Sequence, residues 1–195
     1  KKIIVTGCSS GIGYFIAENL IKSGYKVVGL SRNEPKEKYN FDFEKCDVRN
    51  FDSVKSFFSK IKKDKDIYGL LNIAGVASMN LLVSTPDKTI QDIINTNLIG
   101  TIYCVKEVIP CFVRSQVGRI INFSSFAVKI GLQGESAYVA SKAGVEGFTR
   151  SIARELATLN VTVNCVSPGP IKTKLTSGVP SSYIDKIVQQ QIINQ

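Results

Sequence analysis

Short apolar runs alternate along this chain with longer segments in which apolar residues recur at helical spacing. Apolar runs bounded by polar residues or glycine predict buried strands, whereas amphipathic segments predict helices. The predicted strands cover residues 2–5, 26–30, 41–48, 68–73, 119–123 and 161–166. The predicted helices cover residues 11–23, 51–63, 86–116, 136–159 and 184–193, with bends at Gly100 and Pro110.

Strand and helix follow one another throughout the 195-residue chain. This order is typical of α/β proteins, in which a parallel sheet carries helices on both faces. Because crossover connections are right-handed, we expect one doubly wound domain over residues 1–195. The last predicted element is a helix, so we expect the sheet to lack its final strand within this chain.

The segment Thr6–Gly13, T-G-C-S-S-G-I-G, follows the first predicted strand and opens the first predicted helix. Glycines at these places allow a sharp turn and a close approach of the backbone to a pyrophosphate, and the helix N-terminus offers free N–H groups. The turn therefore predicts a Rossmann-type dinucleotide site, although an ordinary strand–helix turn also uses glycines. The expected contacts are Gly7, Ser9, Ser10, Gly11, Ile12 and Gly13.

Ser31 and Arg32 follow the second predicted strand, and the first carboxylate beyond them is Glu34. An acidic residue at this place binds the ribose 2′-hydroxyl of NAD, whereas an arginine accommodates the 2′-phosphate of NADP. The sequence therefore favours NADP over NAD as the cofactor. The alternative is that Arg32 stacks on the adenine or points to solvent.

Tyr138 and Lys142 are four residues apart in a predicted helix and therefore share one face. A lysine ammonium beside a phenol favours the phenolate, so we expect a Tyr138 pKa below the reference of about 10. The chain has no histidine, so tyrosine is the expected acid–base residue. Ser125 precedes Tyr138 by thirteen positions and is its expected partner, with the adjacent Ser124 as the alternative assignment.

The formal charge of +9 suits an anionic cofactor, an acidic protein partner or nucleic acid. The basic residues are spread along the chain without a stripe of interleaved aromatics, which makes nucleic acid the weaker interpretation. No apolar run approaches the roughly 18 residues that indicate a membrane helix. We therefore expect a cytoplasmic protein that does not bind membranes.

The five cysteines are scattered and form no Cys-x-x-Cys pair, and histidine is absent. We therefore expect free thiols and no metal site. Cys8 lies inside the glycine-rich turn, where a nearby helix N-terminus can lower a thiol pKa and favour oxidation. A redox-sensitive Cys8 is accordingly a secondary hypothesis.

These motifs together resemble the short-chain dehydrogenase/reductase family over essentially the whole chain. The resemblance rests on the glycine-rich turn, on Ser125 and on Tyr138-x-x-x-Lys142. Further motifs at family spacing are Asp47-Val48, Asn72-Ile73-Ala74-Gly75, Asn97 in N-L-I-G, and Pro168-Gly169 followed by Ile171 and Thr173. Two departures are Ile73, where the family usually has a second Asn, and the short connection 31–40, where it often has a helix.

The resemblance implies an NAD(P)-dependent oxidoreductase that interconverts a ketone and a secondary alcohol. It makes Tyr138 the general acid in reduction, Lys142 the residue that holds the nicotinamide ribose, and Ser125 the hydrogen-bond partner of the substrate oxygen. Asn97 would help to hold a water in a proton relay. The implied cofactor contacts are Asp47, Val48, Asn72, Ala74, Gly75, Tyr138, Lys142, Pro168, Gly169, Ile171 and Thr173.

Residues 172–195 would form the substrate lid in this family, and their apolar composition fits a keto-acyl chain better than a sugar. Residues 118–169 look especially like bacterial 3-oxoacyl-acyl-carrier-protein reductases. We therefore expect reduction of a 3-oxoacyl thioester with NADPH. The alternatives are dehydrogenation of a sugar, polyol or other secondary alcohol and, in another class, a non-catalytic NADP-binding sensor or scaffold.

Two kinds of protein contact are also expected. An acidic acyl carrier protein would be attracted to a basic enzyme. The candidate residues for that contact are Arg114, Arg119, Lys129, Lys172 and Lys174. The two long helices carry apolar residues that predict a homodimer or homotetramer, namely Ile102, Val105, Ile109, Ile152 and Leu156.

Overall fold

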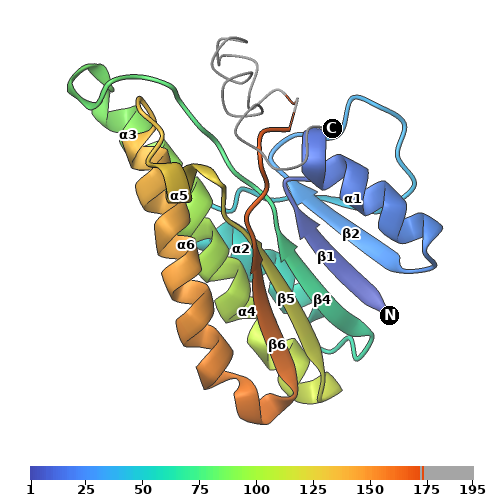
Figure 1. Ribbon diagram of the computed structural model, residues 1–195. Coiled ribbons are helices and arrows are strands. Elements are labelled where there is room, and N and C mark those ends of the chain that lie inside the picture. Colours follow the sequence, from blue (N-terminus) through green and yellow to red (C-terminus); the bar gives the residue numbers. More distant parts are fainter. Residues whose placement is uncertain (172, 174–195) are drawn as a thin grey trace.

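The computed structural model describes residues 1–171 and 173, and these form one parallel sheet with helices on both faces (Figure 1). The strands are β1 (Lys2–Thr6), β2 (Lys26–Ser31), β3 (Asp42–Lys45), β4 (Ile67–Asn72), β5 (Gly118–Phe123) and β6 (Val161–Val166). Their order in the sheet is β3-β2-β1-β4-β5-β6, and every neighbouring pair is parallel. The predicted doubly wound Rossmann-type fold is therefore confirmed. The predicted helix 184–193 and the predicted lid segment lie outside the described residues, apart from residue 173.

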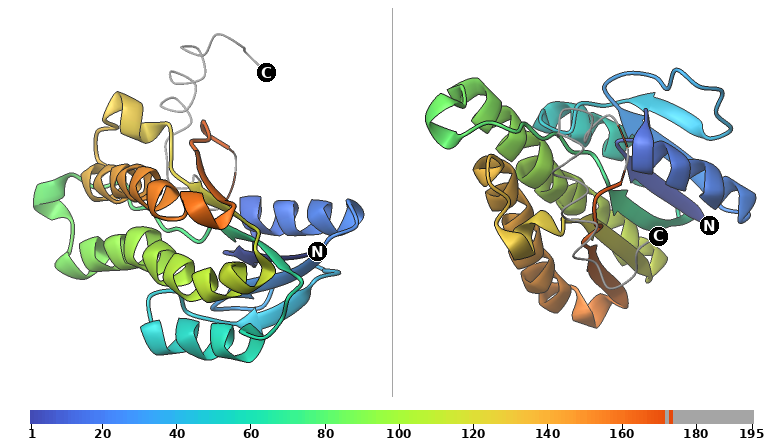
Figure 2. Two further views of the ribbon diagram at one scale, coloured as in Figure 1. Left: turned by 90° about the horizontal axis from the view of Figure 1, so that it is seen from below. Right: turned by 45° about the horizontal axis from the view of Figure 1, so that its top comes forward.

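The helices pass from the carboxyl end of one strand back to the amino end of the next (Figure 2). They are α1 (Gly11–Lys22), α2 (Phe51–Ile61), α3 (Asp87–Ile94), α4 (Gly100–Ser115), α5 (Ala127–Ile130) and α6 (Ser136–Glu155). A π-helical turn, Asn95–Ile99, joins α3 to α4 immediately before Gly100, and α4 continues through Pro110. The helix α5 was not predicted, because four residues are too few to show helical periodicity.

Alternate residues of each strand enter two separate cores, as the pleat of a strand requires. On one face, Ile4, Leu70 and Ile120 pack against α2, α4 and the end of α6. On the other face, Val5 and Leu71 belong to a second cluster with residues of α1. Burial on both faces explains why the central strands read as continuous apolar runs rather than as alternating ones.

The helical stretch from Asp87 to Ser115 is long and apolar enough to cross a membrane by length and composition, with a mean hydropathy of 1.2. Half of that window is buried inside the fold. Val105, Val108 and Phe112 of this stretch are each at most 1% exposed and lie in the core against the sheet. The apolar composition of the stretch is therefore accounted for by packing within the domain.

The same packing corrects the predicted subunit contact. Val105, Ile152 and Leu156 are buried in the main core, and Ile109 packs against it. These residues were wrongly assigned to an outer surface because an apolar stripe on a helix does not show whether it faces the sheet or a second subunit. Of the predicted contact residues, Ile102 alone does not belong to this core cluster.

The connection between β2 and β3 contains no helix, but it is held against α1. The hydroxyl of Tyr14 donates to the Lys38 carbonyl at 2.6 Å, and the backbone and side-chain amides of Asn40 donate to the Glu18 carboxylate, both at 2.8 Å. The ring of Phe41 then fills the space next to Gly29. A Cβ on Gly29 would lie 2.6 Å from that ring. These contacts fix the short connection beside the start of the cofactor pocket.

Candidate functional site

Two adjoining pockets lie at the carboxyl ends of the strands, on either side of the point where the strand order reverses between β1 and β4. Ligands bind at such switch points in open α/β sheets. One pocket contains the glycine-rich turn and is called here the cofactor pocket; the other contains Tyr138 and is called the substrate pocket. The residues that line both are Ile12, Ile73, Gly75, Ala77 and Thr173.

The glycine-rich turn lines the cofactor pocket with Gly7, Ser9, Ser10, Gly11, Ile12 and Gly13. Gly7 has a φ of +73°, and a Cβ there would lie 2.7 Å from the Cα of Ala74. A Cβ on Gly13 would lie 2.3 Å from the Gly7 carbonyl oxygen. The turn therefore depends on missing side chains at both positions and leaves the N-terminus of α1 open to an anion, which fits the pyrophosphate of a dinucleotide.

Thr6 joins this turn to the loop after β4. Its Oγ1 accepts hydrogen bonds from the backbone amides of Ile73 at 3.0 Å and Ala74 at 3.1 Å. The loop is therefore held above Gly7, and Ala74 and Gly75 line the cofactor pocket. Ile73, which departs from the family pattern, keeps this backbone contact because it uses its amide rather than its side chain.

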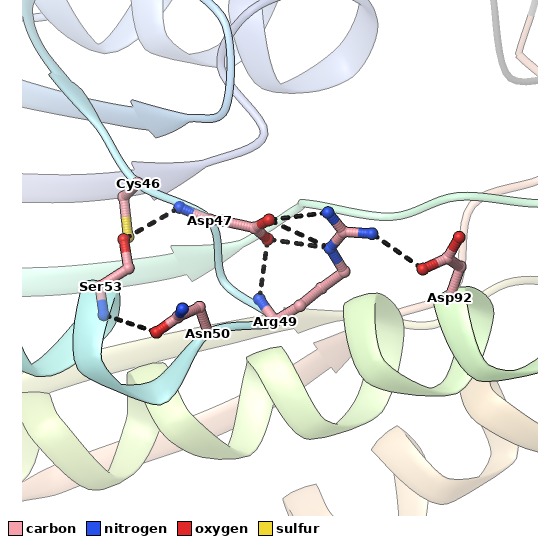
Figure 3. Close-up of polar contacts among 6 residues, drawn as sticks. All are labelled: Cys46, Asp47, Arg49, Asn50, Ser53 and Asp92. Carbon is pink, nitrogen blue, oxygen red and sulfur yellow. Dashed lines mark hydrogen bonds and ion pairs between the residues drawn. The ribbon is translucent and has the colours of Figure 1, made fainter. Parts of the chain in front are cut away.

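Asp47 lines the cofactor pocket next to Val48, and its carboxylate is held by Arg49 (Figure 3). The Arg49 guanidinium binds both oxygens of Asp47 through Nε and Nη2 at 2.8–3.2 Å and reaches Asp92 of α3 through Nη1 at 2.8 Å. Hydrogen bonding to Arg49 holds the pKa of Asp47 below its usual range. The pocket therefore presents an ionised carboxylate whose charge is already compensated.

The end of β2 lies in the same pocket, where Ser31 and Arg32 are both lining residues. Arg32 is exposed, and no ion pair joins it to a carboxylate among the described residues. Its charge contributes to the lowered pKa of Asp47. Glu34 accepts a hydrogen bond from Tyr39 and does not line the pocket.

Asn72 differs from the other proposed cofactor residues because its side chain is turned into the core. Asn72 and Asn122 are aligned in the register of β4 and β5, and Asn72 Nδ2 donates to Asn122 Oδ1 at 2.9 Å. Asn122 Nδ2 in turn donates to Thr149 Oγ1 of α6 at 2.9 Å. Asn72 is absent from the described lining of both pockets and instead connects the sheet to α6.

The substrate pocket brings Ser125 and Tyr138 together. The Ser125 hydroxyl hydrogen-bonds the phenol of Tyr138 and also accepts from the Ala127 amide at 3.2 Å. Ser124, the alternative candidate, donates to the Glu146 carboxylate at 2.8 Å and contacts the Lys142 carbonyl. Ser125 is therefore the serine paired with Tyr138, while Ser124 fastens β5 to α6.

The pKa of Tyr138 is raised rather than lowered, which corrects the sequence expectation. Burial is the largest cause, since only 7% of the residue is exposed, and the charge of Glu135 adds to it. The Ser125 hydrogen bond opposes both effects. The Lys142 Nζ lies 5.9 Å from the ring centre of Tyr138, so desolvation of the phenol outweighs the nearby lysine charge.

Lys142 is held by the end of β5. Its Nζ donates to the Phe123 carbonyl at 2.6 Å, and the side chain is almost completely buried. Burial lowers the pKa of this ammonium to about 8. A lysine poised near neutral pH can accept and release a proton, which suits a relay behind Tyr138.

Asn97 is fully buried in the π-helical turn and clamps the loop after β4. Its Oδ1 accepts from the Val76 amide at 2.8 Å, and its Nδ2 donates to the Val76 carbonyl at 2.9 Å and to Ser141 Oγ at 3.0 Å. These contacts place Asn97 beside Lys142, because a Cβ on Gly75 would touch Asn97 Oδ1 and Lys142 Nζ at 3.4 and 3.6 Å.

The remaining predicted residues line the two pockets. Pro168, Gly169 and Ile171 lie in the substrate pocket, and Thr173 lies in both.

The secondary hypothesis gave Cys8 a lowered pKa, but Cys8 is fully buried, and desolvation raises its thiol pKa to about 11. The redox hypothesis for Cys8 is therefore wrong, since a buried neutral thiol is a poor nucleophile.

The basic residues suggested for acyl carrier protein lie in different places. Arg119 is the second residue of β5 and Arg114 lies in the last turn of α4, so both lie at the amino edge of the sheet, opposite the two pockets. Their side chains bind carbonyl groups there, Arg114 that of Lys62 and Arg119 those of Gly118 and Asn160. Lys129 of α5 is near the substrate pocket and pairs with Glu146 at 3.7 Å. Lys172 and Lys174 lie outside the described residues.

Sequence reasoning missed the positioning roles of Thr6 and Arg49 and the presence of Glu135 in the substrate pocket. Arg49 follows Asp47 by two residues, a spacing that could have suggested the pair. Glu135 precedes Tyr138 by three residues and is the N-cap residue of α6. Nothing in the sequence showed that this carboxylate is buried.

Comparison with known proteins agrees with this geometry. The short chain dehydrogenase family model matches residues 1–183. The 3-oxoacyl-[acyl-carrier-protein] reductase FabG of Buchnera aphidicola is 38% identical over 93% of this chain and 78% of its own length. The FabG of Vibrio harveyi is 39% identical over 92% of this chain and 77% of its own.

Solved structures include relatives that act on other substrates. The ligand-free aldohexose dehydrogenase of Thermoplasma acidophilum has a TM-score of 0.86 and 38% identity, covering 96% of this chain and 76% of its own. The 4-hydroxyisoleucine dehydrogenase complexed with NADH has a TM-score of 0.88 and 25% identity, covering 100% of this chain and 83% of its own. With the turn at Gly7–Gly13 and the Ser125–Tyr138–Lys142 group in place, the chain belongs to the short-chain dehydrogenase/reductase family, whose members are oxidoreductases that act on CH–OH groups with a nicotinamide cofactor.

Proposed function

We propose that this protein reduces the 3-oxo group of an acyl thioester to a 3-hydroxy group with NADPH. The observation that carries the proposal is the substrate pocket, in which the Ser125–Tyr138 pair opens onto mainly apolar walls. These walls include Ile12, Ile73, Phe126, Ile130 and Leu132. Similarity to the FabG reductases supports a 3-oxoacyl substrate over other ketones.

In this mechanism the protein positions a carbonyl and supplies a proton. Tyr138, kept neutral by burial, gives its phenolic proton to the carbonyl oxygen, and the Ser125 hydroxyl hydrogen-bonds the same oxygen. Lys142 stands behind Tyr138 in the proton relay, and Asn97 would help to hold a water that carries protons between Lys142 and solvent. A bound nicotinamide supplies the hydride.

The cofactor pocket supports NADPH over NADH. Arg32 offers a cation at the end of β2 that no carboxylate among the described residues neutralises, and Asp47 is already compensated by Arg49. An arginine at this place accommodates the ribose 2′-phosphate. The cofactor residues that would line this half are Gly7, Ser9, Ser10, Gly11, Ile12, Gly13, Ser31, Arg32, Asp47 and Val48.

The test is oxidation of NADPH or NADH by the protein with acetoacetyl thioester as substrate. We expect reduction with NADPH preferred. Absence of turnover while NADPH still binds would refute the 3-oxoacyl substrate and would leave the family assignment in place. Equal rates with NADH would refute only the role of Arg32.

A second candidate is dehydrogenation of an aldose or polyol. The specific observation in its favour is the similarity to the aldohexose dehydrogenase, which matches this chain as closely in sequence as the FabG reductases do. It predicts NAD(P) reduction by aldohexoses and none by a 3-hydroxyacyl thioester. Substrate oxidation assays with both compounds separate the two candidates.

An acidic acyl carrier protein and a homo-oligomer remain part of the proposal. Among the basic residues considered, Lys129 is the one within the described residues that adjoins the substrate pocket. Replacing Lys129 with Glu should weaken reduction of the protein-bound thioester more than that of a small thioester. Light scattering of the protein tests the oligomer, which a monomeric mass would contradict.

A further inference from the structure

Glu135 is a buried carboxyl group in the substrate pocket that the mechanism above does not use. It lies immediately before α6, lines the same pocket as Ser125 and Tyr138, and is 6% exposed. Its backbone amide donates to the Leu132 carbonyl at 3.2 Å. Within the described part of the chain, no hydrogen bond or ion pair reaches its side-chain carboxyl group.

The surroundings of Glu135 favour the neutral form of the carboxyl. Tyr138 and Lys142, both on α6, are the other ionisable groups among the described lining residues. The strand ends, α5, residues 168–171 and residue 173 contribute none to this described lining. The nearby cation of α5, Lys129, is paired with Glu146 at 3.7 Å. Burial raises the pKa of Glu135 above its usual value. A neutral carboxylic acid can donate a hydrogen bond, which a carboxylate cannot.

Glu135 and Tyr138 are also placed to serve one small molecule. Glu135 is the N-cap residue of α6 and Tyr138 lies in the first turn of that helix, and both residues line the substrate pocket. A 3-oxoacyl thioester carries two carbonyl oxygens separated by one methylene group, a spacing that such a pair can span.

We propose that Glu135 positions the substrate by donating a hydrogen bond from its carboxylic acid to the thioester carbonyl, while the 3-oxo oxygen contacts Ser125 and Tyr138. This inference rests on the proposed function and assigns a recognition group for the 1,3-dicarbonyl unit. Simple ketones lack the second oxygen and gain nothing from Glu135. The residue would thereby select 3-oxoacyl thioesters from other ketones.

The test compares acetoacetyl thioester with a monoketone of similar length that has a methylene group in place of the thioester carbonyl. Glu135→Leu removes the donor, and Glu135→Gln retains an N–H donor that does not titrate. Glu155→Leu makes the first change at an exposed site at the other end of α6. NADPH affinity is measured for each variant as a check on folding. Glu135 lines only the substrate pocket, so this affinity reports the state of the neighbouring cofactor pocket.

The expected readout is the ratio of kcat/KM for the thioester to that for the monoketone. This ratio should fall about tenfold in Glu135→Leu, should be largely restored in Glu135→Gln, and should be unchanged in Glu155→Leu. In the unaltered protein it should decline as the pH rises through the raised pKa of Glu135, because the donor proton is lost. In Glu135→Gln it should not depend on pH.

Three results would overturn the assignment. Equal losses on both substrates in Glu135→Leu would mean that Glu135 supports the fold or Tyr138 alone. Equal losses in Glu135→Gln and Glu135→Leu would mean that an acceptor is needed, as for a sugar hydroxyl. No reduction of the thioester by the unaltered protein would refute the proposed function and, with it, this role. The first two leave the proposed function standing.

Discussion

The cofactor pocket is formed mainly by backbone atoms, whereas the substrate pocket depends on ionisable side chains. The cofactor pocket is shaped by the backbone of the turn after β1, where side chains are missing at Gly7 and Gly13. The substrate pocket is shaped by buried ionisable side chains, and burial shifts the pKa of Tyr138, Glu135 and Lys142. The first should therefore be sensitive to added volume and the second to lost protons.

This difference follows from what each half must do. A pyrophosphate is bound by N–H groups and the helix dipole, so nearby side chains obstruct it. Proton transfer needs groups whose pKa values depart from those in water, and burial provides that shift. Any substitution of Gly7 or Gly13 adds a Cβ and should therefore be harmful. In the substrate pocket, even an isosteric change that removes a proton should be harmful.

The largest effect is expected from Tyr138→Phe, which removes the phenolic proton and little else. Turnover should fall by about 10²–10⁴-fold, while NADPH affinity changes little. Tyr68→Phe is the matched control, because Tyr68 lies in β4 under Lys1 and Arg119 at the amino edge of the sheet. Full activity of Tyr138→Phe would indicate another proton donor, and single-turnover kinetics make the measurement.

Gly13→Ala should have the next largest effect, because its Cβ would lie 2.3 Å from the Gly7 carbonyl oxygen. Overpacking of this kind costs about 1–3 kcal/mol, which should lower the Tm by several degrees and weaken NADPH binding. Gly147→Ala is the control within α6, where the nearest atom is 3.8 Å away and the change should raise the Tm slightly. Unchanged Tm and NADPH affinity in Gly13→Ala would contradict the backbone account.

Arg32→Gln tests whether one side chain in the cofactor pocket selects the nucleotide. It should weaken NADPH binding by about tenfold or more and leave NADH binding nearly unchanged, since only NADPH carries the 2′-phosphate. Arg150→Gln, at an exposed position on α6, controls for the overall charge. Titration of both nucleotides gives the answer, and parallel losses for NADPH and NADH would reject the phosphate contact.

The smallest predicted effect is a pH dependence. Lys142 has a pKa lowered to about 8, so its ammonium is lost as the pH rises through that value. Because the charged form is the one proposed to hold the ribose, kcat/KM for NADPH should decline above about pH 8. Lys142→Arg, which stays charged, should not show this decline. A flat profile across the neutral and alkaline range would contradict the assignment.

Much of the architecture was predictable because the relevant signals are local. Every strand and the helices α1, α2 and α6 were located from apolar runs and helical spacing, and the alternation implied a parallel sheet. The positions of Gly7, Gly13, Ser125 and Tyr138 followed from motif spacing. The helix α5 was missed because it is a single turn held by its neighbours.

Burial was the property that sequence reasoning misjudged most often. Tyr138 was expected to have a lowered pKa, Cys8 a reactive thiol, and Ile152 an outward position, yet all three are buried. In each case the sequence supplied the residue and its local neighbours but not the number of side chains that exclude water around it. Desolvation depends on residues distant in the chain, so it could not be read from spacing.

The sequence by itself determined the order of the elements, the glycine-rich turn and the pairing of Tyr138 with Lys142, because each depends on residues within one element or one turn. The tertiary structure alone decided that Arg49 also pairs with Asp92 of α3, that Asn72 faces the core, and that Glu135 enters the substrate pocket without a partner among the described residues. The physical reason is that these outcomes depend on charge compensation and desolvation, which arise only when distant segments pack together.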